Sequence, residues 1–203
     1  MDKYFRIGAL PGAFVLTISL SVVSLILALF CPTPDRWFCL AAMLFSSAGD
    51  IFLMDFRGLS KKLPSYFILG AICFMLAHIL YIFSFSQLLR FGGYPLLNPG
   101  FAAALLLGIA LLIYFLKTMT DRSSLPLALV YLAIIIANCS VIFSYAWATF
   151  PTRPLSILAP LGALSFLLSD AIIGLGLLSG NHRFDHLIWW FYPVGQLLLI
   201  LAA

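Results

Sequence analysis

Long apolar runs separated by short polar stretches fill almost the whole chain. Seven runs can be distinguished, and they cover residues 9–30, 37–54, 64–89, 99–118, 125–149, 155–179 and 185–203. Each run is close to the roughly 20 residues with which an α-helix crosses a bilayer, and prolines mark most of the joints. The pattern predicts an all-α protein, a polytopic transmembrane bundle of about seven helices, which forms a single integral membrane domain over residues 1–203.

Composition excludes most other classes of protein. Hydrophobic residues make up 64% of the chain and charged residues only 9%, whereas soluble domains carry about 25% charged residues. Disordered chains are poor in apolar residues, so disorder is excluded as well. The net charge of +4 comes from basic residues that stand singly between apolar runs, without a nucleic-acid motif. We therefore expect membrane lipids and no nucleic acid among the partners, and the sequence predicts no oligomeric state.

The basic residues are divided unequally between the two sets of connections. When the connections are numbered alternately from the N-terminus, one side holds Lys3, Arg6, Arg57, Lys61, Lys62, Lys117, Arg122 and Arg183, and the other holds Arg36, Arg90 and Arg153. Basic residues concentrate in cytoplasmic loops. We therefore predict a multi-pass protein of a bacterial inner membrane or a eukaryotic endomembrane, with the N-terminus in the cytoplasm and the C-terminus on the opposite side.

Three ionisable side chains, those of Asp50, His78 and Asp170, lie inside apolar runs. Such a residue costs about 2.5–3.5 kcal/mol on insertion scales and usually faces the interior of the bundle. The other polar positions that we group with them are Ser46, Tyr81, Tyr131, Asn138, Tyr192 and Gln196. Counted at about 1.5 Å per residue, the set falls in the cytoplasmic half of the bilayer. We predict that it lines one interior cavity, which opens toward the cytoplasmic leaflet.

A structural interpretation of the same residues competes with this one. Single polar residues in membrane helices often serve only as interhelical hydrogen bonds. This alternative stays open for Ser46 and Asn138, and ordinary aromatic packing stays open for Tyr81. Two carboxyl groups are harder to explain in this way, because one amide would make the same contact at lower cost. Asp50 and Asp170 are therefore the first candidates for chemistry.

Two buried carboxyl groups with different surroundings can divide acid and base work. Burial disfavours the charged form, so one carboxyl can stay protonated while the other is ionised. This arrangement suits hydrolysis through an oxocarbenium-like state, and a vinyl ether is a natural substrate for it. His182 and His186 have the i, i+4 spacing of some zinc ligands, but they lie at the mouth of the bundle, and we predict no metal site.

Four short motifs resemble those of the YhhN-like lysoplasmalogenase family of membrane proteins. They are FSSAGDIFLM (45–54), FMLAHILY (74–81), GALSFLLSD (162–170) and FYPVGQLLL (191–199), in the family's order. The resemblance implies hydrolysis of the vinyl ether bond of lysoplasmalogens, which gives a fatty aldehyde and glycerophosphoethanolamine or glycerophosphocholine, with no cofactor. Many members of the family have an additional N-terminal helix, so eight helices are the alternative to seven.

The resemblance and the residue chemistry together assign expected roles. We expect Asp50, Asp170 and His78 to be catalytic, and Tyr192 and Gln196 to orient the oxygens of a lysophospholipid substrate. Tyr131, Tyr81, Asn138 and Ser46 are further candidates for substrate binding. Two alternative functions stay open: a proton-coupled transporter or lipid-binding protein, because Asp and His chains also relay protons, and a metal-dependent lipid amidase that resembles alkaline ceramidases.

Overall fold

The structure, a computed structural model, describes residues 13–53, 65–118 and 125–203. Within these ranges the chain forms seven α-helices and two short 3₁₀ turns, and no strand. The helices are α1 (Ala13–Phe30), α2 (Pro34–Leu53), α3 (Tyr66–Phe91), α4 (Pro99–Thr118), α5 (Leu125–Thr149), α6 (Leu158–Ser179) and α7 (Ile188–Ala202); the turns are Pro154–Ile157 and Asp185–Leu187. The predicted all-α fold is confirmed.

Several helix ends follow from the chemistry of single residues. Pro34 and Pro99 are the first residues of α2 and α4, where the N–H that proline lacks would have no helical partner. Asn98 caps α4, because its Oδ1 accepts a hydrogen bond from the backbone N–H of Phe101 at 3.2 Å. Gly180 ends α6 with φ of 67°, a left-handed conformation that glycine adopts without strain.

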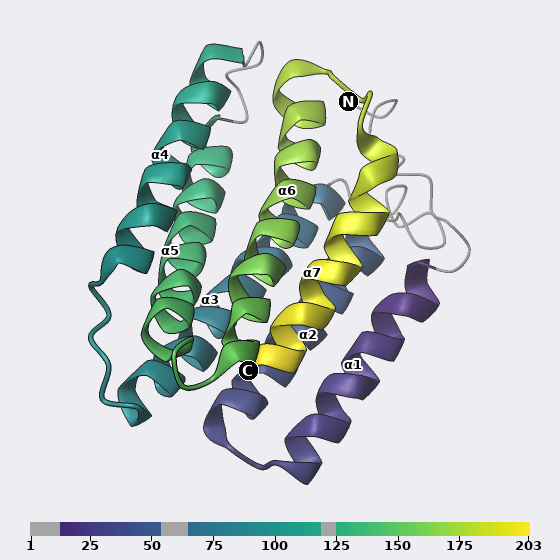
Figure 1. Cartoon of the computed structure of the whole chain (residues 1–203). Coiled ribbons are helices and arrows are strands. Elements are labelled where there is room, and N and C mark those ends of the chain that lie inside the picture. The colour runs from purple at the N-terminus through teal and green to yellow at the C-terminus, as the bar shows by residue number, and fades with distance from the viewer. Residues whose placement is uncertain (1–12, 54–64, 119–124) are drawn as a thin grey trace.

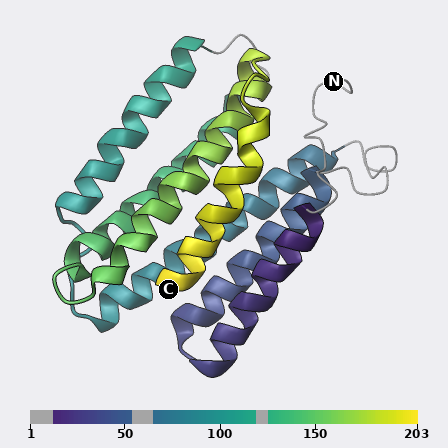
Figure 2. The same ribbon diagram turned by 45° about the vertical axis from the view of Figure 1, so that its right-hand side comes forward.

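Six of the described helices form a closed ring. Helix α1 packs on α2, α2 on α3, α3 on α5, α5 on α6, α6 on α7, and α7 returns to α1. Helix α2 also contacts α7 across the ring, so the ring is flattened. Helix α4 lies outside it against α5, at the left edge of the bundle in Figure 1, and the turned view in Figure 2 shows α4 and α1 at opposite sides. The interior of the ring can therefore receive side chains from every helix except α4.

Consecutive helices run in opposite directions, so the connections gather at two ends of the bundle (Figure 1). We call these the α6–α7 end, which contains residues 180–187, and the α5–α6 end, which contains residues 150–157. Lys117 and Arg183 lie at the first, and Arg36, Arg90 and Arg153 at the second. The other basic residues behind the predicted orientation lie outside the described residues: Lys3, Arg6, Arg57, Lys61, Lys62 and Arg122.

Within the described ranges, five stretches are long and apolar enough to cross a membrane: α2, α3, α4, α5 and the 26 residues of Pro154–Ser179, which contain α6. The chain is therefore a multi-pass membrane protein. The run predicted over 185–203 begins as a 3₁₀ turn, and α7 itself has 15 residues. At 1.5 Å per residue α7 is about 22 Å long, shorter than the hydrocarbon core of roughly 30 Å.

Candidate active site

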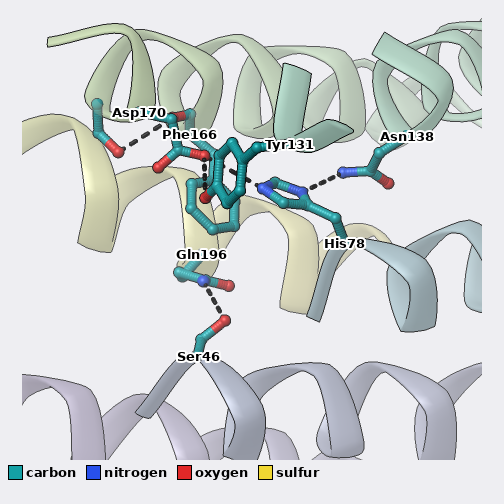
Figure 3. Close-up of polar contacts among 8 residues, drawn as sticks. Ser46, His78, Tyr131, Asn138, Phe166, Asp170 and Gln196 are labelled. Carbon is teal, nitrogen blue, oxygen red and sulfur yellow. Dashed lines mark hydrogen bonds and ion pairs between the residues drawn. The ribbon is translucent and has the colours of Figure 1, made fainter. Parts of the chain in front are cut away.

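Asp170 of α6 is the centre of a polar chain inside the ring (Figure 3). Its Oδ2 accepts a hydrogen bond from the Tyr131 hydroxyl at 3.2 Å and lies 3.1 Å from Nε2 of His78. The other ring nitrogen of His78, Nδ1, lies 3.0 Å from Nδ2 of Asn138. An amide nitrogen only donates, so Nδ1 of His78 is the acceptor in this contact. The hydrogen of the neutral ring is therefore on Nε2, which donates a hydrogen bond to Oδ2 of Asp170. Helices α3, α5 and α6 supply this chain.

Asp50 of α2 has a separate set of partners. Its Oδ2 accepts hydrogen bonds from the hydroxyl groups of Thr17 and Tyr192, both at 2.8 Å. The exposed fractions are 5% for Asp50, 2% for Thr17 and 4% for Tyr192, so water does not compete strongly for these contacts. Helices α1 and α7 thus each supply one donor to the carboxyl group of α2.

A third polar group lies about one helical turn away from Asp50 and Tyr192. Nε2 of Gln196 donates to the hydroxyl of Ser46 at 2.9 Å, and Oε1 of Gln196 accepts from the hydroxyl of Tyr81 at 2.5 Å. All three side chains are fully buried. The amide of Gln196 thus ties α7 to α2 and α3. Contact of Ser46, Tyr81 and Gln196 with a substrate stays a prediction.

Aromatic rings fill the space around the carboxyl groups. The ring of Phe166 lies 4.6 Å from that of His78 and 5.5 Å from that of Tyr192. Phe74 meets Phe166 and Tyr192 edge to face, at 6.2 and 5.8 Å. Such pairs add about 0.5–1.5 kcal/mol beyond the burial of their area. Two phenylalanines therefore hold the side chains that in turn hold Asp50 and Asp170.

Both carboxyl groups line one cavity, which we call the carboxyl pocket. It contains about 330 Å³ of space not filled by atoms, part of it open to the outside, and its lining residues are Asp50, Leu53, Phe74, Ser169, Asp170, Ile173, Ile188, Trp189 and Tyr192. The hydrogen bonds described above all reach Oδ2 of the two aspartates. Among the described residues no hydrogen bond reaches either Oδ1. Each carboxyl group is thus anchored through one oxygen, and its other oxygen has no hydrogen-bond partner among the described residues.

A second and larger cavity, the apolar groove, lies between α4 and the ring helices α3, α5 and α6. It contains about 920 Å³ of space not filled by atoms, part of it open to the outside. Tyr131 and Asp170 are the polar side chains of its lining, and the other lining residues are apolar. Pockets for small ligands have this character: mostly apolar walls and a few polar groups. The polar groups of the groove belong to the Asp170 chain.

The predicted single cavity is only partly present. Asp50, Asp170 and Tyr192 line the carboxyl pocket and Tyr131 lines the apolar groove, whereas neither of these two cavities is lined by Ser46, His78, Tyr81, Asn138 or Gln196.

Sequence reasoning also missed Thr17. Thr17, Ser21 and Ser24 are all buried and repeat at i, i+4 and i+7 on α1, a spacing that places them on one helix face. Ser21 contacts the hydroxyl of Ser47 at 2.8 Å. This stripe of small polar residues is typical of a helix–helix contact in membranes, and it was the signal available in the sequence.

Two further polar contacts lie at the ends of the bundle. Nδ1 of His182 contacts Oδ2 of Asp185 at 3.0 Å at the α6–α7 end. The Tyr145 hydroxyl donates to the Ala202 carbonyl at the α5–α6 end. Over residues 13–53, 65–118 and 125–203, no group of three His, Cys, Asp or Glu side chains could hold a metal ion. The arrangement in the ring is one of paired carboxyl groups with hydroxyl, imidazole and amide partners.

Comparison with known proteins gives one result. No curated protein and no solved structure matches the chain. The model of the YhhN family matches residues 13–203, a range that contains all seven helices and every residue of the polar groups described above. The chain therefore belongs to the YhhN family.

Proposed function

We propose that the protein hydrolyses the vinyl ether bond of lysoplasmalogens, which releases a fatty aldehyde and a glycerophospho-alcohol. One observation carries the proposal: Asp50 and Asp170 line one pocket, and Oδ1 of each has no hydrogen-bond partner among the residues that the structure describes. Membership of the YhhN family supports the same conclusion. The apolar groove that begins at Asp170 supports a lipid substrate.

The reaction needs an acid, a stabilising anion and water. A protonated carboxyl group transfers its proton to the vinyl carbon remote from the ether oxygen, which leaves an oxocarbenium ion. The second carboxyl group, ionised, stabilises this cation. Water adds to the carbon that carries the oxygen and loses a proton to a carboxylate. The resulting hemiacetal then collapses to the aldehyde and the alcohol, and the first carboxyl group regains its proton.

The neighbours of the two aspartates would position these groups rather than react. Tyr131 and His78 hold Oδ2 of Asp170, and Thr17 and Tyr192 hold Oδ2 of Asp50. Fixing one oxygen orients the other, and a fixed geometry removes entropy from the barrier. In this proposal Oδ1 of each carboxyl group faces the vinyl ether.

The test is aldehyde release by the purified protein from a lysoplasmalogen. We expect Asp50→Asn and Asp170→Asn each to lower kcat by about 10²–10⁴-fold, the usual contribution of a positioned acid or base. Because Asn has the shape of Asp and keeps an acceptor oxygen, the variants should fold. Asp185→Asn, at the α6–α7 end and outside the carboxyl pocket, is the matched control and should keep full activity.

Other results would replace the proposal. Full activity of both Asn variants would remove the mechanism. Uptake of a solute into sealed vesicles without release of aldehyde would establish a transporter instead. Cleavage of an amide-linked lipid that stops on addition of a chelator would establish a metal-dependent amidase.

A further inference from the structure

A thin wall separates the carboxyl pocket from the apolar groove. Leu53, Phe74, Asp170 and Ile173 line both cavities. Three of these side chains are apolar, and the fourth is one of the two carboxyl groups of the proposed chemistry. A ligand that reacts at Asp170 therefore has the groove directly on the other side of the same residue.

Two glycines leave the room that two side chains of the wall, those of Phe74 and Leu53, occupy. A Cβ atom built on Gly49 would lie 2.7 Å from the ring of Phe74, and one built on Gly70 would lie 3.1 Å from the side chain of Leu53. The first distance is too short for real atoms, so Phe74 can occupy its place only because residue 49 has no side chain. The side chains of the wall thus pack directly against the backbone of α2 and α3 at these two glycines.

Small residues also create the space in the groove. Ala71, Ala128, Ala171 and Gly174 line it from α3, α5 and α6. Leu111, Leu112, Phe115 and Leu116 of α4 line it as well, although α4 supplies no side chain to the polar groups inside the ring. The groove is therefore an apolar chamber between α4 and the ring, with a carboxyl group and a tyrosine hydroxyl among its lining.

We propose that the apolar groove binds one hydrocarbon chain of a single-chain ether lipid, which passes the wall beside Phe74 and leaves the head group on the side of Asp50. This inference rests on the proposed function and names the site that selects its substrate. The carboxyl pocket has about 330 Å³ of space not filled by atoms and the groove about 920 Å³, so we assign the hydrocarbon chain to the groove.

The experiment uses a probe that cannot react. A lysophosphoethanolamine with a saturated alkyl ether chain and a terminal photoreactive diazirine is added to the full-length protein in detergent, and cross-linked residues are identified by mass spectrometry. We expect cross-links in α4, α5 and α6. Ala128→Leu, which fills the groove from α5, should lower the cross-linking yield about tenfold, as a filled cavity excludes its ligand. Ala133→Leu, on the same helix at an exposed position, should not.

A second variant protects the test against misfolding. Gly174→Leu fills the groove from α6, where a Cβ would lie 3.2 Å from the ring of Phe115, and it should lower the yield in the same way. A probe with a shorter chain should recover binding to both variants. Equal cross-linking of Ala128→Leu and Ala133→Leu, or cross-links confined to lipid-facing residues of α1, would overturn the inference.

The two proposals can fail separately. The probe contains no vinyl ether, so its binding is independent of turnover. Cross-linking in the groove without aldehyde release from a lysoplasmalogen would contradict the proposed function and support the binding site. Aldehyde release together with unchanged KM and kcat for long chains in Ala128→Leu and Gly174→Leu would support the function and overturn the chain site.

Discussion

The two aspartates are anchored by different helices but in the same manner, through two donors on Oδ2. Asn138 completes the Asp170 group by fixing the tautomer of His78, and its own Oδ1 is buried without a partner among the described residues. An unpaired buried acceptor costs about 1–3 kcal/mol. Unpaired buried polar groups of this kind are often retained for a function. The environment of Asn138 is therefore consistent with a role in positioning His78.

Thr17 gives the sharpest test of anchoring at this scale. Thr17→Val keeps the shape of the side chain and removes the hydroxyl that donates to Asp50. A hydrogen bond of this kind contributes about 1.5–3 kcal/mol when the acceptor is charged, so we expect kcat for aldehyde release to fall about tenfold or more. Ser19→Ala on the same helix, where the hydroxyl only contacts the carbonyl of Val15, should change nothing. Equal activity of both variants would show that Thr17 does not orient Asp50.

At the scale of elements, the backbones of α6 and α7 lie in close contact at Gly162 and Gly195. A Cβ on Gly195 would lie 2.8 Å from the backbone nitrogen of Phe166 and 3.0 Å from the carbonyl oxygen of Gly162. Membrane helices associate through such small residues because lipid offers no hydrophobic force between them. This contact places Asp170 and Tyr192 on the walls of one pocket.

Gly195→Ala should therefore force α6 and α7 apart. Overpacking of a tight contact costs about 1–3 kcal/mol, and we expect a lower thermal midpoint of the purified protein together with reduced aldehyde release. Val194→Leu, at the neighbouring position with 48% of its surface exposed, is the control and should leave both unchanged. A midpoint for Gly195→Ala equal to that of the parent would mean that the backbones can separate without loss.

At the scale of the whole molecule, alternating helices bring the carboxyl pocket nearer to the α6–α7 end, where Ile188 and Trp189 belong to its lining. The predicted orientation places this end in the cytoplasm. Substrate would then reach the pocket from the cytoplasmic leaflet, with its phosphate close to the basic connections.

Cys31 reports on this orientation. It is free and exposed at the α5–α6 end, whereas Cys39 and Cys139 are buried. A maleimide that cannot cross membranes should label the protein in right-side-out vesicles and not in inverted ones, and Cys31→Ser should remove the label. Arg183→Cys in the Cys31→Ser background should reverse the pattern. Labelling of Cys31 only in inverted vesicles would show that the topology is the opposite of the predicted one.

The sequence by itself determined the all-α membrane class, the approximate helix ranges and the two costly carboxyl groups. These are local properties, since hydropathy, proline and the price of a buried charge can each be read within one segment. For the pairs Tyr192–Asp50 and His78–Asp170, the sequence predicted only that the residues lie at similar depths in the membrane, and not that they contact each other.

Tertiary structure alone decided which helices close the ring, that α4 stays outside it, and that an apolar groove forms behind Asp170. The contact of Thr17 with Asp50 and the packing of Phe74 and Phe166 against Tyr192 follow from that arrangement. The physical reason is that an apolar helix face looks the same whether lipid or another helix covers it, so hydropathy does not mark partners. The arrangement of the helices depends on close contacts at Gly49, Gly162 and Gly195. The atoms on the other side of these contacts come from distant segments of the chain.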